Sequence, residues 1–558
     1  MNIALEKREK LQALINEAIN QAVAGGDLSL AEVPDFTLEA PKDPNHGDFA
    51  TNIALVAAKA ARKPPRDVAA ALVKYIPVGG FIEKVEIAGP GFINFFLSHE
   101  WLADILRSIE ARREDYGSSD YGQGEKVLLE FVSANPVGPL NVVNARAAAV
   151  GDTLARLMRA CGYTVGTEFY VNDAGNQADV FANSLVARCH QQVDPEYPFP
   201  EEGYPGEYVT DLAKRLLQEK PDFLDWPREE QLAFCKRWGT DQMVEWQAAD
   251  LRTYGVEFDV WFRERDLHAA GELEKVIEYF REKGYLYEEE GALWFRSTDF
   301  GDDKDRVLIK SDGAYTYVTA DIAYHWDKLK RGYTKLIDIL GPDHHGYIGR
   351  MKAAIQALGY GADTLEVLIL QYVALLRDGQ QVKMSKRAGE FITMQDLLDE
   401  VGTDAARYFF LMRSPESHLD FDLNLAVEQS SENPVYYVQY AHARICSILR
   451  QAEDMGVVVP SASEADLSLL TSDFEINLIK KLGELPEEII LATTQREPHR
   501  IARYALDLAS IFHSFYTHCH VLGEDAPLRD ARLVLVKCVQ IVLKRSLSLL
   551  GISAPEQM

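Results

Sequence analysis

Residues 127–162 read VLLEFVSANPVGPLNVVNARAAAVGDTLARLMRACG and contain the strongest fold signal in the chain. The segment opens with a short apolar run bounded by turn-forming residues, which is typical of a buried strand in a parallel sheet. A loop with two prolines follows, and a long helical pattern rich in alanine begins directly after it. A strand, a Pro/Gly turn and a long helix in this order predict an α/β fold of the doubly wound, parallel-sheet (Rossmann-like) type.

The turn inside this segment is suited to binding phosphate. Gly138 would let a nucleotide approach the backbone closely, Pro139 suits the start of a helix, and the exposed amides at that start could receive a phosphate. Taken by itself, the segment from Ala134 to Asn144 is equally well explained as an ordinary connection between a strand and a helix. The turn is therefore a candidate ATP site whose support must come from the rest of the chain.

A second strand-to-helix pattern, LIDILGPDHHGYIGRMKAAIQALG, occupies residues 336–359. It puts Asp343, His344 and His345 after the carboxyl end of a strand, where open α/β sheets bind their ligands. Two adjacent histidines could also indicate a metal, but chain neighbours rarely face one centre, and no further ligands have a convincing spacing. The pattern therefore predicts a ligand-binding position and no metal site.

The chain divides by pattern into three domains, whereas its length of 558 residues predicts three or four. Residues 1–112 combine an amphipathic opening helix with strand-like residues around a Gly-Pro-Gly turn, which indicates a small α+β domain. Residues 120–428 contain the nucleotide fold, interrupted by a mostly helical insertion at about residues 176–265. Residues 430–558 show long amphipathic helices and almost no strand pattern, so we expect an all-α bundle.

Composition narrows the class of protein and its compartment. No window approaches the ~18 uninterrupted apolar residues of a membrane span, and the charged opening segment does not resemble a signal peptide. The six cysteines are spread along the chain without a Cys-x-x-Cys pair, as expected of reduced thiols. The net charge of −28 argues against a simple nucleic-acid-binding domain, although an acidic protein can have a local basic groove. We therefore expect a soluble cytoplasmic protein.

The most specific short motif is Lys383-Met384-Ser385-Lys386, within a loop region at residues 375–400. Asp378-Gly379 predicts a hairpin turn before the motif, and Thr393 followed by Asp396 predicts a helix cap after it. Two lysines three residues apart on a flexible loop could neutralise charge that develops when an α-phosphate is attacked. Two lysines in a loop are more often simply exposed to solvent. The position of this pair after a split nucleotide fold nevertheless favours the catalytic interpretation.

Class I aminoacyl-tRNA synthetases combine a His-x-Gly-His signature at the first helix with a Lys-Met-Ser-Lys loop, and this chain has the second motif intact. Over nearly its whole length it resembles arginyl-tRNA synthetases of the bacterial type. The segments that carry the resemblance are HGDFATN (46–52), GPGFIN (89–94), GTEFYVNDAGNQ (166–177), GEYVTDLAKRL (206–216), AYTYVTADIAYH (314–325), NPVYYVQYAHARICSI (433–448) and APEQM (554–558). The resemblance implies ATP-dependent ligation of L-arginine to tRNA(Arg) through an arginyl-adenylate, with AMP and pyrophosphate as products.

The chain departs from the family pattern at the first signature. Asn141 and Asn144 occupy the positions of the two histidines, and Val143 occupies that of the glycine. An asparagine amide can still donate a hydrogen bond to a phosphate oxygen, but it cannot carry the positive charge of a protonated histidine. Neither step of the implied reaction needs a side-chain nucleophile, so our candidate catalytic residues are the charge stabilisers Asn141, Asn144, Lys383 and Lys386.

By resemblance, three further sets of residues bind the substrates. Arginine, whose planar guanidinium calls for carboxylates, would contact Glu130, Asn135, Tyr317 and Asp321. ATP, with Mg²⁺ as part of the substrate complex, would contact Gly138, Asn141, Asn144, Asp343, His344, His345 and Lys386. The tRNA would contact Asn45, Phe92, Tyr437, Tyr440 and Arg444. The last three could equally be bundle core with a solvated rim, although aromatic and guanidinium groups suit the bases of an RNA loop.

Two alternatives to the ligase remain open. A catalytically weak paralogue that binds tRNA or a partner is favoured by the altered signature and opposed by the intact lysine loop. A nucleotidyltransferase acting on a small molecule would leave the C-terminal bundle without a purpose. Under the main interpretation the partners are tRNA(Arg), L-arginine and ATP, and we expect a monomer with no tightly bound cofactor and no membrane contact.

Overall fold

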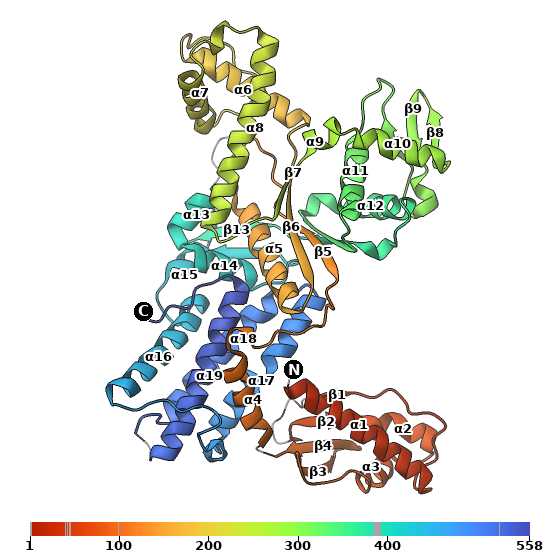
Figure 1. The fold of residues 1–558 in the computed structure, drawn as a ribbon, viewed down its shortest axis with the longest axis vertical. Coiled ribbons are helices and arrows are strands. Elements are labelled where there is room, and N and C mark those ends of the chain that lie inside the picture. The colour runs from red at the N-terminus through yellow and green to blue at the C-terminus, as the bar shows by residue number, and fades with distance from the viewer. Residues whose placement is uncertain are drawn as a thin grey trace.

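The computed structural model describes residues 3–39, 41, 43, 46–98, 100–382, 392–523 and 525–558. The molecule is elongated, with a small N-terminal unit at one end, a helical insertion at the other and a twisted sheet between them (Figure 1). The C-terminal helices contact both the central part and the helix that follows the N-terminal unit. Within the described part of the chain, every helix is too short or too polar to cross a bilayer.

A five-stranded parallel sheet organises the centre, in the strand order β12-β11-β5-β6-β7. Its strands are β5 (Lys126–Glu130), β6 (Thr164–Val171), β7 (Val260–Arg263), β11 (Lys335–Leu340) and β12 (Leu365–Ile369). The chain adds β6 and β7 on one side of β5 and later returns to the other side for β11 and β12. The strand order therefore reverses between β5 and β11, which is where open α/β sheets bind ligands. The predicted fold class is confirmed.

Helix α5 (Val142–Ala160) connects β5 to β6 and packs closely on the sheet. Small side chains make this approach possible, since Ala145, Ala148 and Ala149 are completely buried. At Gly151 a Cβ atom would lie 2.2 Å from the Phe131 ring. The alanine-rich pattern of the sequence is thus a requirement of the distance between helix and sheet.

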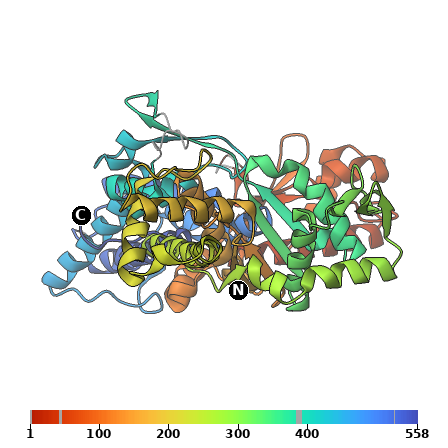
Figure 2. The ribbon, with the colours of Figure 1, turned by 90° about the horizontal axis from the view of Figure 1, so that it is seen from above.

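Two units are inserted into the parallel sheet. The helical insertion consists of α6 (Asn176–Gln191), α7 (Glu207–Glu219) and α8 (Arg228–Thr253), which have a hydrophobic core of their own. The second unit contains α9 (Glu264–Ala269), α10 (Glu272–Glu282), the antiparallel strands β8 (Leu286–Glu289), β9 (Ala292–Phe295) and β10 (Arg306–Ile309), and α11 (Tyr317–Lys330). Helix α12 (His345–Ala357) follows β11. Seen from above, the two units diverge to different sides of the molecule (Figure 2).

The structure corrects three expectations from the sequence. Strand β7 lies inside the range expected to be helical, and four residues are too short for a clear periodic pattern. The pattern LWFRS (293–297) predicts a strand where the nucleotide fold resumes, but its first three residues belong to β9 of the small antiparallel sheet. The sequence pattern around Tyr317 and Asp321 predicts strand ends, but both residues lie in the first turns of α11. Their aromatic and β-branched neighbours favour a strand, but packing on the sheet overrides that propensity.

The region after the sheet confirms two local predictions. Strands β13 (Val373–Arg377) and β14 (Gln380–Gln381) form the expected hairpin, and both turn residues, Asp378 and Gly379, have positive φ values of 53° and 72°. Thr393 caps α13 (Met394–Val401), and a reciprocal capping box with Asp396 is present. The chain continues through α14 (Thr403–Leu411), β15 (Leu419–Asp422) and α15 (Leu423–Val427), and β15 pairs in parallel with β13. Residues 383–391, with Lys383 and Lys386, lie outside the described residues.

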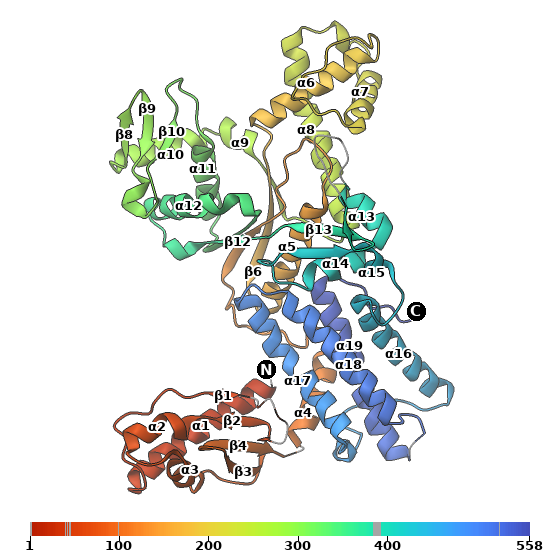
Figure 3. The same ribbon diagram turned by 180° about the vertical axis from the view of Figure 1, so that it is seen from behind.

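The two ends of the chain form the remaining units. The N-terminal unit packs α1 (Ile3–Ala24), α2 (Ile53–Ala61) and α3 (Pro65–Val73) on an antiparallel sheet of β1 (Leu38–Glu39), β2 (Phe49–Thr51), β4 (Phe92–Leu97) and β3 (Ile82–Ala88). Helix α4 (Glu100–Arg112) leads from it to the C-terminal helices α16 (Pro434–Asp454), α17 (Asp473–Thr494), α18 (His499–His518) and α19 (Ala526–Leu550). Figure 3 shows α4 against this bundle from behind. All six cysteines are buried free thiols.

Candidate active site

A row of three carboxylates crosses the parallel sheet at the switch point. Glu130, the last residue of β5, lies opposite Asp338 of β11 on one side and Glu168 of β6 on the other. Paired residues of neighbouring strands point to the same face of a sheet, so the three carboxylates share one face. They are 6%, 1% and 0% exposed, respectively, and therefore need cations close by.

Helix α11 supplies these cations. The Nζ of Lys328, which is completely buried, lies 2.5 Å from Glu130 Oε2 and 3.0 Å from Asp338 Oδ1. Arg331 donates two hydrogen bonds to Glu168, of 2.6 and 2.9 Å, so the pair is bidentate. Burial alone would lower the pKa of Lys328, but Asp338 and Glu130 raise it above its ordinary value. Lys328 is therefore a permanent positive charge between Glu130 and Asp338.

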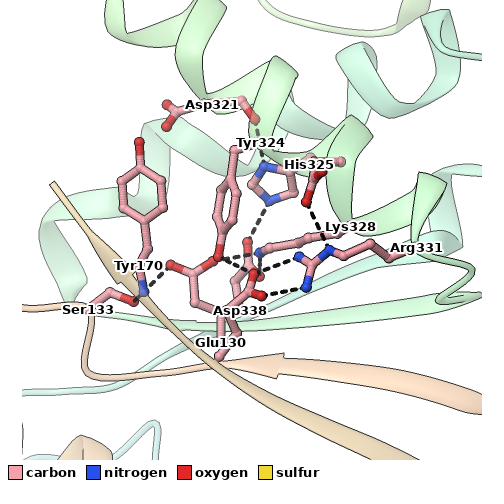
Figure 4. Close-up of polar contacts among 11 residues, drawn as sticks. Glu130, Ser133, Tyr170, Asp321, Tyr324, His325, Lys328, Arg331 and Asp338 are labelled. Atoms are coloured by element: carbon pink, nitrogen blue, oxygen red, sulfur yellow. Dashed lines mark hydrogen bonds and ion pairs between the residues drawn. The ribbon is translucent and has the colours of Figure 1, made fainter. Parts of the chain in front are cut away.

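His325 extends this chain of contacts to Asp321. One ring nitrogen, Nε2, lies 2.8 Å from Asp338 Oδ2, and the other, Nδ1, lies 2.8 Å from the backbone carbonyl oxygen of Asp321. Burial alone would raise the pKa of Asp338, but Lys328 and His325 hold it well below its usual range. Glu130 and the first turns of α11 are thus joined through one buried network (Figure 4).

The Asp321 carboxyl lies above this network, and Glu130 and Glu264 are its acidic neighbours; these three carboxyl groups together are called the acidic pocket. Tyr170 of β6 points toward it in Figure 4, and no ion pair to Asp321 is present among the described residues. Burial raises the pKa of the Asp321 carboxyl to about 7, with Glu130 and Glu264 adding to the rise while His325 and Arg350 oppose it. A carboxyl group with acidic neighbours and no paired cation can receive a cationic ligand such as a guanidinium.

The other two candidates for arginine binding lie at the start of α11 and in the turn after β5. Tyr317 precedes Asp321 by four residues on α11, so both side chains lie on one helical face, and Tyr317 is 63% exposed. Asn135 lies in the turn after β5, where its Nδ2 donates to Gln177 Oε1 at 2.8 Å. The structure thus connects Glu130 and Asp321 through the network, whereas no contact joins Tyr317 or Asn135 to it among the described residues.

Asn141 and Asn144 form the first turn of α5. Asn141 is the N-cap, and its Oδ1 accepts from the amides of Val143 at 2.9 Å and Asn144 at 3.2 Å. In return Asn144 Oδ1 accepts from the Asn141 amide at 3.0 Å. These amides are therefore not free for a phosphate, which corrects the sequence-based expectation. Because both side-chain oxygens serve the cap, the Nδ2 groups are the parts of both residues left to donate to a ligand.

The residues that follow the lysine-bearing segment lie beside this helix start. Thr393, just after the segment, forms a β-bridge with Asn141, and the Met394 amide donates to the Leu140 carbonyl at 2.8 Å. Before the segment, the Val382 amide donates to the carbonyl of Leu375 in β13 at 2.9 Å. The geometry of Lys383 and Lys386 lies outside the described residues, but the described end of their loop touches Asn141.

A buried arginine fixes α5 to the strands around this loop. The Arg146 side chain is completely buried and donates to the carbonyls of Gln371 at 2.8 Å, Ser414 at 3.0 Å and Ser417 at 3.1 Å. Gln371 precedes β13, and Ser414 and Ser417 precede β15. The helix start and the hairpin that leads into the lysine loop are therefore tied together through the interior of the protein.

The remaining ATP candidates follow β11. Asp343 and His344 are exposed after the carboxyl end of β11, and Tyr372 donates a hydrogen bond of 2.9 Å from its hydroxyl to Asp343 Oδ1. The side chain of His345 lies outside the described residues, although its backbone begins α12. These residues lie at the same edge of the sheet as Glu130, as the strand order requires.

The candidate tRNA residues lie far from this edge. Phe92 is 38% exposed at the start of β4, and Asn45 lies outside the described residues. In α16 the Tyr437 ring lies 4.8 Å from the His513 ring, and the Arg444 guanidinium lies 4.7 Å from the Tyr440 ring. Burial lowers the pKa of His513 to about 4, with Arg444 adding to the effect, so the ring is neutral at pH 7.

Sequence reasoning missed the residues beneath the pocket. They are Glu168, Glu264, Lys328, Arg331 and Asp338. A helical interpretation of residues 317–330 would have put Tyr317, Asp321, His325 and Lys328 on one face, because they recur at intervals of three and four. The aromatic run at the start of that segment favoured a strand and hid the pattern. The carboxylate row depends on sheet register and left no local signal.

Family models and a solved structure identify the class of protein. The models described as "Arginyl tRNA synthetase N terminal domain", "tRNA synthetases class I (R), catalytic domain" and "DALR anticodon binding domain" match residues 9–97, 106–413 and 438–558. The methionyl-tRNA synthetase of Mycobacterium tuberculosis has a related fold, with a TM-score of 0.56 at 13% identity over 77% of this chain and 92% of that one. The fold and the catalytic-domain match define a class I aminoacyl-tRNA synthetase.

More similar relatives identify the family. The arginine–tRNA ligases of Symbiobacterium thermophilum and Bacillus subtilis are 52% and 49% identical, and each match covers 100% of both chains. The solved arginyl-tRNA synthetase of Thermus thermophilus has a TM-score of 0.77 at 24% identity, over 99% of this chain and 100% of that one. The chain belongs to the arginine–tRNA ligase family. These comparisons give no support to a paralogue that has lost the ligase activity.

Proposed function

We propose that the pocket between β5 and α11 activates L-arginine with Mg-ATP and that the arginyl group then passes to tRNA(Arg). The guanidinium lies against Asp321 and Tyr317, with Glu130 and Asn135 nearer the reacting end. The observation that carries this proposal is the contact between Thr393 and Asn141, because it puts the end of the lysine loop beside the N-cap of α5. A triphosphate at the switch point would then have donors on both sides.

The first step forms one bond and breaks one bond at phosphorus. An oxygen of the arginine carboxylate attacks the α-phosphate, and the bond to pyrophosphate breaks. The Nδ2 groups of Asn141 and Asn144 donate to phosphate oxygens from one side, and Lys383 and Lys386 neutralise the departing pyrophosphate from the other. Asp343, His344 and His345 hold the nucleoside, and Gly138 lies in the turn beside the phosphates. Mg²⁺ enters with ATP and needs no protein cage.

The second step transfers the arginyl group to the RNA. A terminal ribose hydroxyl attacks the carbonyl carbon of the arginyl-adenylate, the bond to AMP breaks, and the hydroxyl proton is released. Phe92 and Asn45 contact the outer corner of the tRNA, and Tyr437, Tyr440 and Arg444 contact the anticodon arm. The protein acts as a monomer in the cytoplasm.

Pyrophosphate exchange tests this proposal directly. With ATP, labelled pyrophosphate, tRNA(Arg) and each amino acid in turn, exchange is expected with L-arginine alone and aminoacylation of tRNA(Arg) should follow. Absence of exchange with every amino acid would support the binding paralogue, and exchange in the absence of tRNA would support the nucleotidyltransferase. Lys386→Ala should slow activation by at least tenfold with little change in tRNA binding, because removing one charge stabiliser costs about 3 kcal/mol in comparable sites. An equal loss of both would contradict the role of Lys386.

A further inference from the structure

The turn between β5 and α5 is held from the side of the helical insertion. Gln247 of α8 donates from Nε2 to the carbonyl oxygens of Asn135 at 3.1 Å and Gly138 at 2.9 Å. Tyr208 of α7 donates from its hydroxyl to the Val137 carbonyl at 2.6 Å. Three carbonyls of a four-residue turn therefore face two side chains that come from more than 70 residues away in the sequence.

The side-chain amide of Gln247 is oriented with its nitrogen toward the two carbonyl oxygens of the turn. Its side chain is only 1% exposed, and its Nε2 group has two hydrogens for two carbonyl acceptors. Its Oε1 is buried and has no hydrogen-bond partner among the described residues. A flipped amide would put that oxygen against two carbonyl oxygens, so the donors are satisfied at the expense of the acceptor.

Gly138 makes room for the Tyr208 hydroxyl beside the turn. A Cβ atom at this position would lie 3.2 Å from the Tyr208 hydroxyl, which is tighter than side chains usually pack, so the hydroxyl would have to shift by a few tenths of an ångström. The sequence suggested that glycine is needed here for a nucleotide, but in the structure its open side faces the insertion. The Tyr208 ring also packs edge-on against Trp246 of α8, so the hydroxyl is held by two helices.

The segment GEYVTDLAKRL (206–216) thereby acquires a function. It was part of the family resemblance, but no step of the reaction uses it, and it lies in an inserted unit outside the nucleotide fold. Its third residue is Tyr208. The turn that this residue holds joins the arginine side of the pocket, at Asn135, to the ATP side, at Asn141.

We propose that Tyr208 and Gln247 are positioning residues that fix the turn at residues 135–138, so that ATP meets a preformed start of α5. These two side chains, called the clamp, keep the carbonyl oxygens of the turn directed into the insertion and away from the negatively charged triphosphate. This inference rests on the proposed function. The guanidinium pocket is built by β5, β6, β11 and α11, so the clamp acts on ATP and on the rate of activation more than on arginine.

The test is steady-state pyrophosphate exchange with full-length Tyr208→Phe and Gln247→Glu variants. Tyr208→Phe removes one hydroxyl and Gln247→Glu removes both donors without changing the volume of the side chain. We expect the KM for ATP to rise about threefold to tenfold in the first and more in the second, in line with loss of one and two hydrogen bonds. The KM for arginine should stay within twofold of wild type in Tyr208→Phe, because Tyr208 holds Val137 and does not bond Asn135. In Gln247→Glu it should rise less than the KM for ATP.

The matched control is Tyr197→Phe, in the same insertion, whose ring stacks on His190 and does not contact the turn. It should leave both KM values and kcat unchanged. An unchanged KM for ATP in Tyr208→Phe and Gln247→Glu, or an equal rise in both KM values, would overturn the clamp. If Gln247→Glu does not fold, Tyr208→Phe alone decides by the same criteria. A wild-type protein that does not exchange with arginine would instead overturn the proposed function.

Discussion

At the scale of single residues, the acidic pocket depends on which of its carboxylates are already paired. Glu130 and Asp338 share Lys328, and Glu168 has Arg331, whereas the Asp321 carboxyl has acidic neighbours instead. The paired groups build the floor of the pocket, and the unpaired one gains most from an incoming cation. In the proposed function, arginine is selected by a charge that the fold leaves uncompensated.

The raised pKa of Asp321 makes arginine binding depend on pH. The groups that face this carboxyl are Glu130, Glu264, His325, Arg350, Tyr170 and Tyr347. A guanidinium binds the ionised carboxylate, so with a pKa of about 7 a proton must leave before binding at lower pH. The KM for arginine should therefore fall about tenfold from pH 6 to pH 8, as one titrating group requires. Exchange kinetics across this range measure the KM for arginine, with the KM for ATP as a reference.

The Asp321→Asn variant should bind arginine weakly at every pH. A KM for arginine that does not change with pH in the wild type would contradict the assignment of Asp321 to guanidinium binding.

Lys328 is expected to control the same pocket from below. Lys328→Met removes a completely buried cation between two carboxylates, and breaking such a pair costs about 3 to 5 kcal/mol of stability. We expect a lower melting temperature and a KM for arginine raised more than tenfold, while Lys328→Arg keeps the charge and loses less.

The control for Lys328 is Lys330→Met on the same helix. Lys330 is partly exposed and pairs with Glu272 at 2.9 Å, a contact worth less than about 1 kcal/mol. This variant should behave as wild type in melting and in exchange kinetics. A Lys328→Met protein with an unchanged KM for arginine would show that the network has no part in the pocket.

At the scale of elements, the start of α5 combines two tasks in the same side chains. The asparagine oxygens satisfy the helix amides, and the asparagine nitrogens are left for the ligand. This division explains how asparagine can replace histidine at the signature without loss of the helix start. It also means that the donors here do not titrate between pH 5 and pH 9.

Substitutions at Asn141 can separate the cap from the donor. Asn141→Ser keeps an N-cap oxygen but loses Nδ2, so stability should stay within about 0.5 kcal/mol while activation slows by at least tenfold. Asn141→Ala loses both, and should also cost about 1 kcal/mol in the free energy of unfolding. Chemical denaturation and single-turnover adenylate formation give the two numbers. If Asn141→Ser activates arginine at the wild-type rate, the Nδ2 group is not a phosphate donor.

At the scale of the whole molecule, the sequence predicted what is local and missed what depends on register. The β5–α5 turn, the hairpin at Asp378 and the cap at Thr393 are each encoded within a few residues, and all three are present. The pairing of Glu130 with Asp338 joins residues about 200 positions apart, so only the folded sheet reveals it. The contact of Tyr208 with the turn has the same origin, because two inserted helices must dock before the side chain has a partner.

In the proposed function, the arrangement of the units separates the RNA-binding residues from the residues that carry the chemistry. The bundle that contains Arg444 lies on the other side of the parallel sheet from the helical insertion (Figure 1), and Arg444 stacks on Tyr440 and Tyr516 without contact to the pocket. Arg444→Ala should therefore raise the KM for tRNA about tenfold, since stacking and phosphate contacts are worth 1 to 3 kcal/mol each, and leave the KM for arginine unchanged. Aminoacylation kinetics measure both constants.

Arg450→Ala, on the same helix but bound to the Glu556 carbonyl, is the control and should change neither. Equal effects of the two substitutions would mean that the charge of α16, and not the aromatic cluster around Arg444, attracts the RNA.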